Sequence, residues 1–127
     1  MKMKFTKIYV DNQDKALTFY TEVLGFVKKA DFLVGSFRWL TVVSPEEPDG
    51  TELLLEPNDN PAPKISQATF FQQGIPATAF AISDLQHEYE RLKQQGVVWT
   101  REPTQMGPVT IAIFDDTCGN LIQLVQV

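Results

Sequence analysis

With 127 residues, the chain has the length of one domain, or of two small modules that share a core. Its formal net charge is −5 and its Lys and Arg residues are scattered, which excludes a basic stripe for nucleic acid and favours, at most, cationic or neutral ligands. No apolar run approaches the ~20 residues of a membrane span, no signal-peptide core follows Met1, and the single Cys118 cannot form an internal disulfide, so we expect a cytoplasmic protein that does not engage a membrane.

The first part of the chain predicts a strand, a helix and three further strands. The stretch KFTKIYV alternates, and its two faces are Phe5, Lys7 and Tyr9 against Thr6, Ile8 and Val10. Asp11 or Asn12 can cap the helix DKALTFYTEVLG, which stops at Gly25. The apolar stripe of this helix is Ala16, Tyr20, Val23 and Leu24. Strands are expected at about 26–34, 37–43 and 51–56.

The second part predicts the same succession of elements. The polar stretch PNDNPAPKISQ holds three of the eight prolines, so we interpret residues 58–76 as a connection. The strand ATAFAI follows, and then a capped helix, LQHEYERLKQQG, which stops at Gly96. The inward residues of this helix are Leu85, Tyr89 and Leu92. Strands are expected at about 97–101, 109–114 and 121–127.

Residues that end equivalent strands, helices and turns recur about 70 residues apart. The offset is 72 between Val10 and Ile82, 71 between Gly25 and Gly96, and 69 between Gly50 and Gly119. The sequence therefore predicts an α+β fold of two tandem strand–helix–three-strand (βαβββ) modules, residues 1–57 and 77–127, forming curved mixed sheets around a cleft within a single domain.

Each module can bury one sheet face under its own helix, so the opposite faces are expected to line the cleft. In the first module these positions are Phe5, Lys7, Tyr9, Glu52, Leu54 and Glu56, and in the second they are Ala77, Ala79, Ala81 and Gln123. An apolar floor with a few polar groups is typical of a small-molecule site. The predicted ligand-binding residues are Phe5, Lys7, Tyr9, Leu54, Ala77 and Gln123.

Three stretches resemble a known family. VDNQDKALTFYTEVLGF, ISDLQHEYERLKQQGV and FDDTCGNLIQLV are similar to the helices and final strand of the vicinal oxygen chelate superfamily, which includes glyoxalase I, bleomycin-resistance proteins and extradiol dioxygenases. The resemblance covers nearly the whole chain. Its motifs are structural, so they specify the fold strongly and the reaction weakly.

The resemblance implies a place for one divalent metal ion, held by four side chains on the open sheet faces. The matching positions here are Phe5, Ala77, Gln123 and Leu54, or Leu53 if that strand is shifted by one residue. Phenyl, methyl and isobutyl groups have no lone pair for a cation, so we expect neither metal nor another cofactor. A register that brought Glu52 or Glu56 to the site would still leave Phe5 and Ala77 at the two positions where the resemblance implies histidine ligands.

Candidate catalytic residues are Glu52, Glu56 and Tyr9. The two carboxylates could form a pair for proton transfer, or they could be solvated near a strand end before Pro57, which we favour. Lys7 and Tyr9 could line a pocket or cover the edge between modules. We interpret His87 as a surface residue and Cys118 as a turn residue. The large aromatic residues are expected mostly in the core or an interface, namely Trp39, Phe70, Phe71 and Trp99. Because Phe70 and Phe71 are adjacent, we expect one of them to face the cleft or a partner subunit.

Three functions remain open. The first is binding of a small organic molecule without metal, by sequestration or with catalysis through Glu52, Glu56, Lys7 or Tyr9. The second is a metal-dependent lyase or isomerase of the glyoxalase I (lactoylglutathione lyase) type or a dioxygenase-related enzyme, and the third is a protein-interaction module. We expect a homodimer, because each module has a sheet face that its own helix cannot cover.

Overall fold

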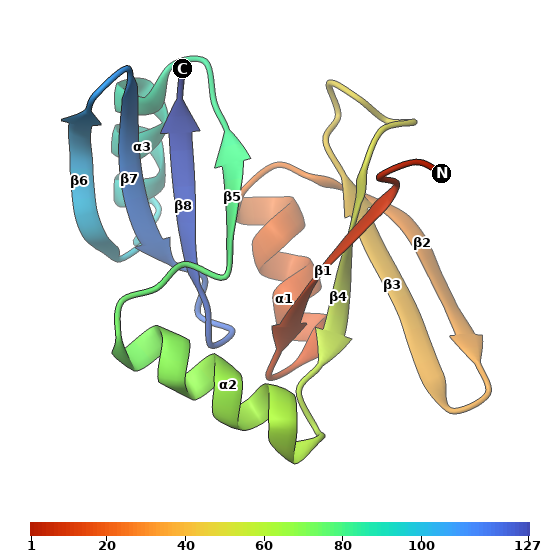
Figure 1. The fold of residues 1–127 in the computed structure, drawn as a ribbon. Helices are drawn as coiled ribbons and strands as arrows, with labels where there is room; N and C mark the ends of the chain where they lie inside the picture. Colours follow the sequence, from red (N-terminus) through yellow and green to blue (C-terminus); the bar gives the residue numbers. More distant parts are fainter. The chain divides into compact units, whose positions relative to one another are not determined.

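The computed structural model describes residues 1–127, which divide into two compact units, Met1–Lys64 and Ile65–Val127. Each unit contains one four-stranded sheet (Figure 1). No helix is long and apolar enough to cross a bilayer. In chain order the elements are β1 (Phe5–Val10), α1 (Gln13–Thr18), the π-helical turn η1 (Phe19–Val23), β2 (Val27–Val34), β3 (Phe37–Val43), β4 (Glu52–Pro57), α2 (Pro61–Gln72), β5 (Thr78–Ala81), α3 (Leu85–Gln94), β6 (Trp99–Met106), β7 (Val109–Asp115) and β8 (Leu121–Gln126).

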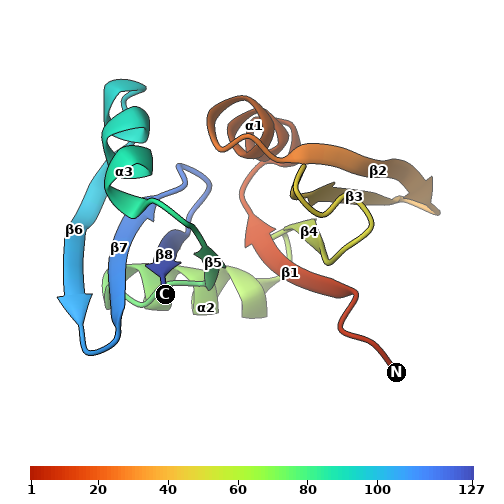
Figure 2. The same cartoon turned by 90° about the horizontal axis from the view of Figure 1, so that it is seen from above.

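In the first unit, α1 covers one face of a sheet whose strands lie in the order β1-β4-β3-β2 (Figure 2). Strand β1 runs parallel to β4, and the other neighbours are antiparallel. The helix begins after Asn12, whose side-chain oxygen accepts a hydrogen bond from Lys15 N at 2.9 Å. The core under α1 consists of the buried side chains Ile8, Val10, Ala16, Tyr20, Leu40, Val42, Leu53 and Leu55.

The end of the first helix differs from the predicted stripe. Ala16 and Tyr20 are buried as expected, but Val23 and Leu24 are only half-buried. The cause is the π-helical turn η1, which holds more residues per turn than an α-helix. Residues beyond that turn are therefore rotated away from the face that the 3.6-residue period predicts.

The second unit repeats the arrangement, with α3 on one face of a sheet in the order β5-β8-β7-β6 (Figures 1 and 2). Asp84 caps α3 by accepting from His87 N at 3.1 Å. The buried side chains under this helix are Leu85, Tyr89, Leu92, Ala112, Phe114, Ile122 and Leu124. The strand–helix–three-strand repeat predicted from the sequence is therefore confirmed.

Two elements differ from the prediction, one that was not expected and one that is longer than expected. The connection 58–76 contains helix α2, which has no buried side chain and so lacks the apolar stripe that identifies most helices. Its prolines, Pro61 and Pro63, lie in the first turn, where a missing N–H costs no intrahelical hydrogen bond. Strand β6 continues to Met106 rather than ending at residue 101, and it accommodates Pro103 because it is an edge strand with an irregular register.

Helix α2 is anchored to the turn between β7 and β8. Gln67 Nε2 donates to the Cys118 carbonyl at 3.2 Å and to Asn120 Oδ1 at 3.1 Å. The turn itself is held by the buried Asp116, whose Oδ1 accepts from the backbone N–H groups of Cys118 and Asn120 at 2.7 and 2.9 Å. Gly119 has φ +101°, and a Cβ at this position would lie 2.7 Å from Gln67 Nε2. Cys118 is thus a buried turn residue, as predicted.

Candidate functional site

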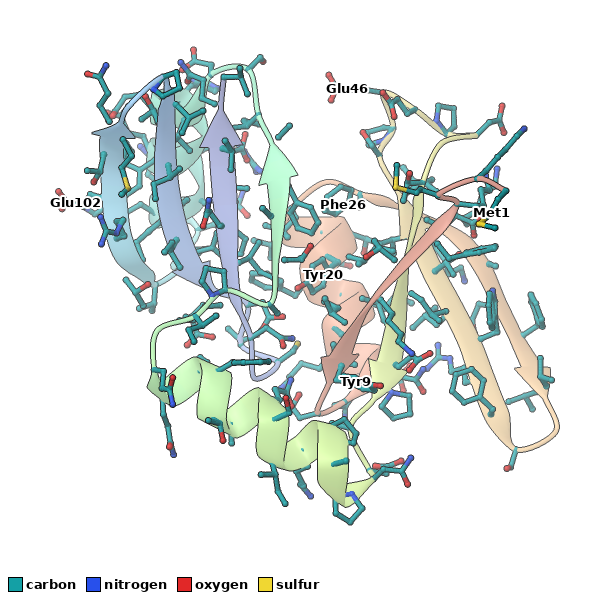
Figure 3. The ribbon with its side chains drawn as sticks, viewed as in Figure 1. Met1, Tyr9, Tyr20, Phe26, Glu46 and Glu102 are labelled. Carbon is teal, nitrogen blue, oxygen red and sulfur yellow. The ribbon has the colours of Figure 1, made fainter.

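The face of the first sheet opposite α1 carries the predicted residues of β1 and β4; we call it open face one. Cross-strand pairing joins Phe5 with Glu52, Lys7 with Leu54, and Tyr9 with Glu56. Paired residues point to the same side of a sheet, so all six side chains share this face. Figure 3 shows the side chains of this unit on the ribbon, with Tyr9 labelled.

Two more aromatic rings, those of Trp39 and Phe32, lie on open face one and form a row with Phe5. Trp39 on β3 is two residues before Thr41, the partner of Leu54, and it pairs with Phe32 on β2. The Trp39 ring meets Phe5 edge to face, with centroids 5.5 Å apart, and stacks with Phe32 at 6.3 Å. Phe5 and Phe32 remain 54% and 53% exposed. This row of rings across three strands offers an apolar surface suited to a flat organic molecule.

The two glutamates of open face one have different surroundings. Glu52 is only 7% exposed; its Oε1 accepts from Thr41 Oγ1 at 2.7 Å, and its Oε2 lies 3.7 Å from Lys4 Nζ. Glu56 is half-buried, with Oε2 3.9 Å from Lys7 Nζ. The expectation that both are solvated is therefore wrong for Glu52. Four residues of extended strand separate them by about 13 Å, so they do not form a carboxylate pair.

The corresponding surface of the second unit, open face two, contains Gln123. This residue pairs with Ala79 on β5 and with Ile113 on β7. Ala77, just before β5, and Ala81, the last residue of β5, lie on the same side as Ala79, and all three alanines are exposed. Gln123 is half-buried among these small and apolar side chains. The structure thus places every predicted ligand-binding residue on the open face of its own unit, although Leu54 is buried there.

The four positions matched to the superfamily's metal site occupy equivalent places in the two units. Leu54 lies diagonally across from Phe5, and Gln123 lies diagonally across from Ala77, whose N–H donates to the Leu121 carbonyl at 2.8 Å. The register therefore favours Leu54, which pairs with Lys7 on open face one, over Leu53, which pairs with Thr6 and points to the helix-covered face; both leucines are 5% exposed.

These side chains do not fit a divalent cation. Phe5, Leu54 and Ala77 have no donor atom, and Gln123 offers one neutral oxygen. Glu52, which pairs with Phe5, already interacts with Thr41 and Lys4.

Other candidates lie away from the open faces. His87 is exposed on α3, in keeping with a surface role. Trp99 packs between Tyr89 and Phe114, with ring centroids 4.9 and 5.3 Å away, and so belongs to the core under α3. Phe70 and Phe71 are both exposed near the end of α2, at 46% and 37%.

Sequence reasoning missed the roles of Phe32, Trp39 and Thr41 on open face one. Trp39 was expected in the core or an interface, and the other two were not singled out. Alternation within 37–43 places Trp39 and Thr41 on one face, but the sequence does not say which face α1 covers. For Phe32, the register shift between Lys28 and Ala30 breaks the alternation that would have identified its side.

Comparison with known proteins identifies the family. The model of the Glyoxalase/Bleomycin resistance protein/Dioxygenase superfamily matches residues 2–124. The chain belongs to this superfamily. Protein YurT of Bacillus subtilis (strain 168) is 62% identical to this chain over 126 residues, which cover 99% of this chain and 99% of YurT. A lactoylglutathione lyase of Neisseria meningitidis serogroup B is 30% identical over 131 residues, covering 99% of this chain and 91% of the lyase.

Solved structures with the same fold include two with more than 25% sequence identity to this chain. The crystal structure of UcmS2 superposes with a TM-score of 0.86 at 31% identity, covering 100% of this chain and 98% of UcmS2. TnmS3, an antibiotic binding protein from Streptomyces sp. CB03234, superposes with a TM-score of 0.79 at 26% identity, covering 99% of this chain and 95% of TnmS3. The family resemblance and the two-module α+β fold expected from the sequence are thereby confirmed.

Proposed function

We propose that this protein binds a small organic molecule whose flat aromatic part packs on open face one. The observation that carries the proposal is the row formed by Phe5, Trp39 and Phe32, two of whose rings are more than half exposed. Stacking on such rings contributes about 0.5–1.5 kcal/mol per pair beyond the burial of apolar area. The similarity to TnmS3, an antibiotic binding protein, supports the binding of a small organic molecule.

The proposed binding uses no divalent metal, because three of the four matched positions carry hydrocarbon side chains. It amounts to sequestration of the ligand. Glu52, the carboxylate next to Phe5, is hydrogen-bonded to Thr41 and lies near Lys4, so it is poorly placed to act as a free base. Metal-free catalysis through Glu56, Lys7 or Tyr9 would instead appear as chemical turnover of the bound molecule.

The test follows the indole N–H signals of the two tryptophans by NMR. The neutral probe N-phenyl-1-naphthylamine is titrated into the labelled protein, with the signals assigned from Trp39→Phe and Trp99→Phe variants. We expect the probe to shift the Trp39 signal, because Trp39 lies on open face one, and to leave the Trp99 signal of the α3 core in place. Native mass spectrometry of the purified protein then identifies a copurifying natural ligand.

Trp99→Phe is also the matched control for affinity. Replacing Trp39 by Leu removes the ring that contacts both Phe5 and Phe32, and we expect probe affinity to fall about tenfold. Trp99→Phe should leave affinity unchanged. Equal losses in both variants, or a shift of the Trp99 signal alone, would contradict a site on open face one.

A second candidate is a metal-dependent lyase of the glyoxalase I type, which is favoured by the 30% identity to the Neisseria lactoylglutathione lyase. A metal that binds the native state raises the melting temperature, so chelation should then lower it. For the metal-free protein that we propose, EDTA leaves the melting temperature unchanged, and adding nickel, zinc or manganese does not raise it. A melting temperature that falls with EDTA and recovers with one of these ions would support the lyase.

We further propose that the protein is a cytoplasmic homodimer. The end of the β2–β3 hairpin exposes apolar side chains beyond the ring row, namely Leu33, Val34 and Phe37. Strand β2 is also an edge of its sheet, with backbone groups open to pairing. A second copy of the chain covering this hairpin would bury that surface. The free thiol of Cys118 suits the reducing cytoplasm.

A further inference from the structure

Open face two carries a guanidinium in the same cross-strand row as Gln123. The row crosses the sheet from β5 to β6 as Ala79, Gln123, Ile113 and Arg101. Residues paired in this way share a face, so the Arg101 side chain projects from the same side as the Gln123 carboxamide. Two strand spacings separate these two residues, which is about 10 Å between their Cα atoms.

A β-bulge gives Arg101 this orientation. Trp99 pairs with Phe114, whereas Arg101 pairs with Ile113, so two steps along β6 correspond to one step along β7. In a regular strand, Trp99 and Arg101 would face the same side. The bulge instead leaves Trp99 in the core under α3 and turns Arg101 to open face two.

Arg101 differs from the other arginines in its partners. Arg38 binds the carboxylates of Asp31 and Asp14, and Arg91 is paired with Glu88. Arg101 is exposed, and its Nη1 lies 3.9 Å from the sulfur of Met106, a weak acceptor. No ion pair neutralises its charge. Its guanidinium is therefore available to a ligand.

We propose that open face two recognises an organic anion: Arg101 binds a carboxylate, sulfonate or phosphate group of the ligand, and Gln123 hydrogen-bonds a neighbouring polar group. The proposal goes beyond the proposed function: it assigns open face two a ligand of its own, an apolar molecule with a negative charge. A guanidinium presents a planar fork of N–H donors, two of which can donate at once to two oxygens of such a group. Between the two polar side chains, Ile113 supplies an apolar contact and is 9% exposed.

This ligand class departs from the bias set by composition. The net charge of −5 favours neutral or cationic ligands at long range. At contact distance, however, the local donor set decides, and salt screens the long-range repulsion within about 10 Å.

The experiment compares two dyes that share their ring system and differ in charge. 8-Anilino-1-naphthalenesulfonate is an anion, and N-phenyl-1-naphthylamine is its neutral counterpart. Both are titrated into the wild-type protein, Arg101→Gln and a control variant, Lys93→Gln. The control removes a cation of the same unit that lies on α3, 5.6 Å from the Tyr89 ring centroid. Far-ultraviolet circular dichroism verifies that each variant is folded.

We expect Arg101→Gln to weaken binding of the sulfonate about tenfold, as for the loss of a hydrogen bond to a charged group, and to leave binding of the neutral dye unchanged. Lys93→Gln should change neither. Equal effects of Arg101→Gln on both dyes, no effect on the sulfonate, or a matching loss in Lys93→Gln would overturn the assignment of Arg101.

The two proposals fail in different ways. If the neutral dye binds and shifts the Trp39 indole signal while Arg101→Gln has no effect on the sulfonate, then only the anion site is wrong. If neither dye binds the folded wild-type protein, the apolar ligand class of the proposed function is wrong, and the anion site is wrong with it.

Discussion

Gln123 and Gln126 lie three residues apart on β8 and serve opposite faces of the sheet. Gln126 Oε1 accepts a hydrogen bond from Leu85 N at 2.7 Å and so satisfies one of the free donors at the start of α3. The carboxamide of Gln123 projects from open face two, between Ala79 and Ile113, and no hydrogen bond of its unit engages it. Gln126 therefore contributes to the fold, and Gln123 is available to a ligand.

The variant Gln123→Leu tests this difference. Leu has a similar volume and no polar group, so a ligand group that bound the amide would be left unpaired at a cost of about 1–3 kcal/mol. We expect affinity for 8-anilino-1-naphthalenesulfonate to fall by roughly 5–150-fold in calorimetry, with thermal stability unchanged or slightly higher. Gln126→Leu is the matched control; it should lose stability and keep its affinity. The reverse pattern would assign Gln123 a structural role.

A second residue-scale feature is Arg38, which joins the β2–β3 hairpin to the start of α1. Its Nε and Nη2 donate to the two carboxylate oxygens of Asp31 at 2.9 and 3.0 Å, and its Nη1 donates to Asp14 at 2.7 Å. The hydrogen bonds from Arg38 hold the pKa of the Asp31 carboxyl below its usual value. The charged carboxylate is thus favoured in the folded protein over the unfolded chain.

This shift has a defined effect on stability. Since the folded-state pKa of Asp31 is depressed, its contribution is fully present above the unfolded-state value near 4 and is lost as pH falls through the folded-state value. We expect wild type to exceed Asp31→Asn in unfolding free energy at pH 7, and the difference to shrink below about pH 4 in urea titrations. Asp14→Asn, which removes a single hydrogen bond from a more exposed carboxylate, should have a smaller effect. A difference between wild type and Asp31→Asn that is constant down to pH 2 would contradict this account.

At the scale of elements, helix α2 has no buried side chain, and its Gln67 is hydrogen-bonded to the β7–β8 turn. Gly119 serves this contact in two ways. It adopts a positive φ, which other residues rarely adopt, and it leaves the space that the Gln67 amide occupies.

Gly119→Ala should therefore lower the free energy of unfolding by more than the strain of a positive φ alone. Gly74→Ala provides the comparison, because Gly74 has φ +73° and a methyl group on its Cα would meet nothing within 4 Å. Both variants incur the strain of a positive φ, roughly 1 kcal/mol, but only Gly119→Ala displaces Gln67. We expect chemical denaturation to show a clearly larger loss of unfolding free energy for Gly119→Ala. Equal losses would mean that the Gln67 contact contributes nothing.

At the scale of the whole molecule, the chain contains the same module twice, and the two copies have diverged on their open faces. Open face one is aromatic and carries carboxylates, whereas open face two is lined by small aliphatic side chains with Gln123 and Arg101. The helix-covered faces keep an apolar character in both units. Packing under a helix restricts a residue to apolar shapes, while an open face is free to adapt to a ligand.

The proposed homodimer is checked by light scattering on the purified protein at micromolar concentration. We expect a mass near twice the 14.4 kDa of one chain, because the hairpin of β2 and β3 exposes apolar side chains that a second copy could cover. Replacing Leu33, which is 71% exposed, by Lys should weaken the association without unfolding the protein. A wild-type protein that scatters as one chain would contradict the dimer.

The sequence by itself determined the two-module fold and the side of the strand on which Phe5, Lys7, Tyr9 and Gln123 lie. These features follow from periods of 2 and 3.6 residues and from a repeat near 70 residues, all of which are visible in the order of residues along the chain. Tertiary structure decided the rest. Glu52 became buried through Thr41 and Lys4, which come from other parts of the chain. Arg101 reached open face two through a bulge, and α2 formed without an apolar stripe. Each of these depends on which residues pair across strands, and pairing between distant segments leaves no period in the sequence from which it could be predicted.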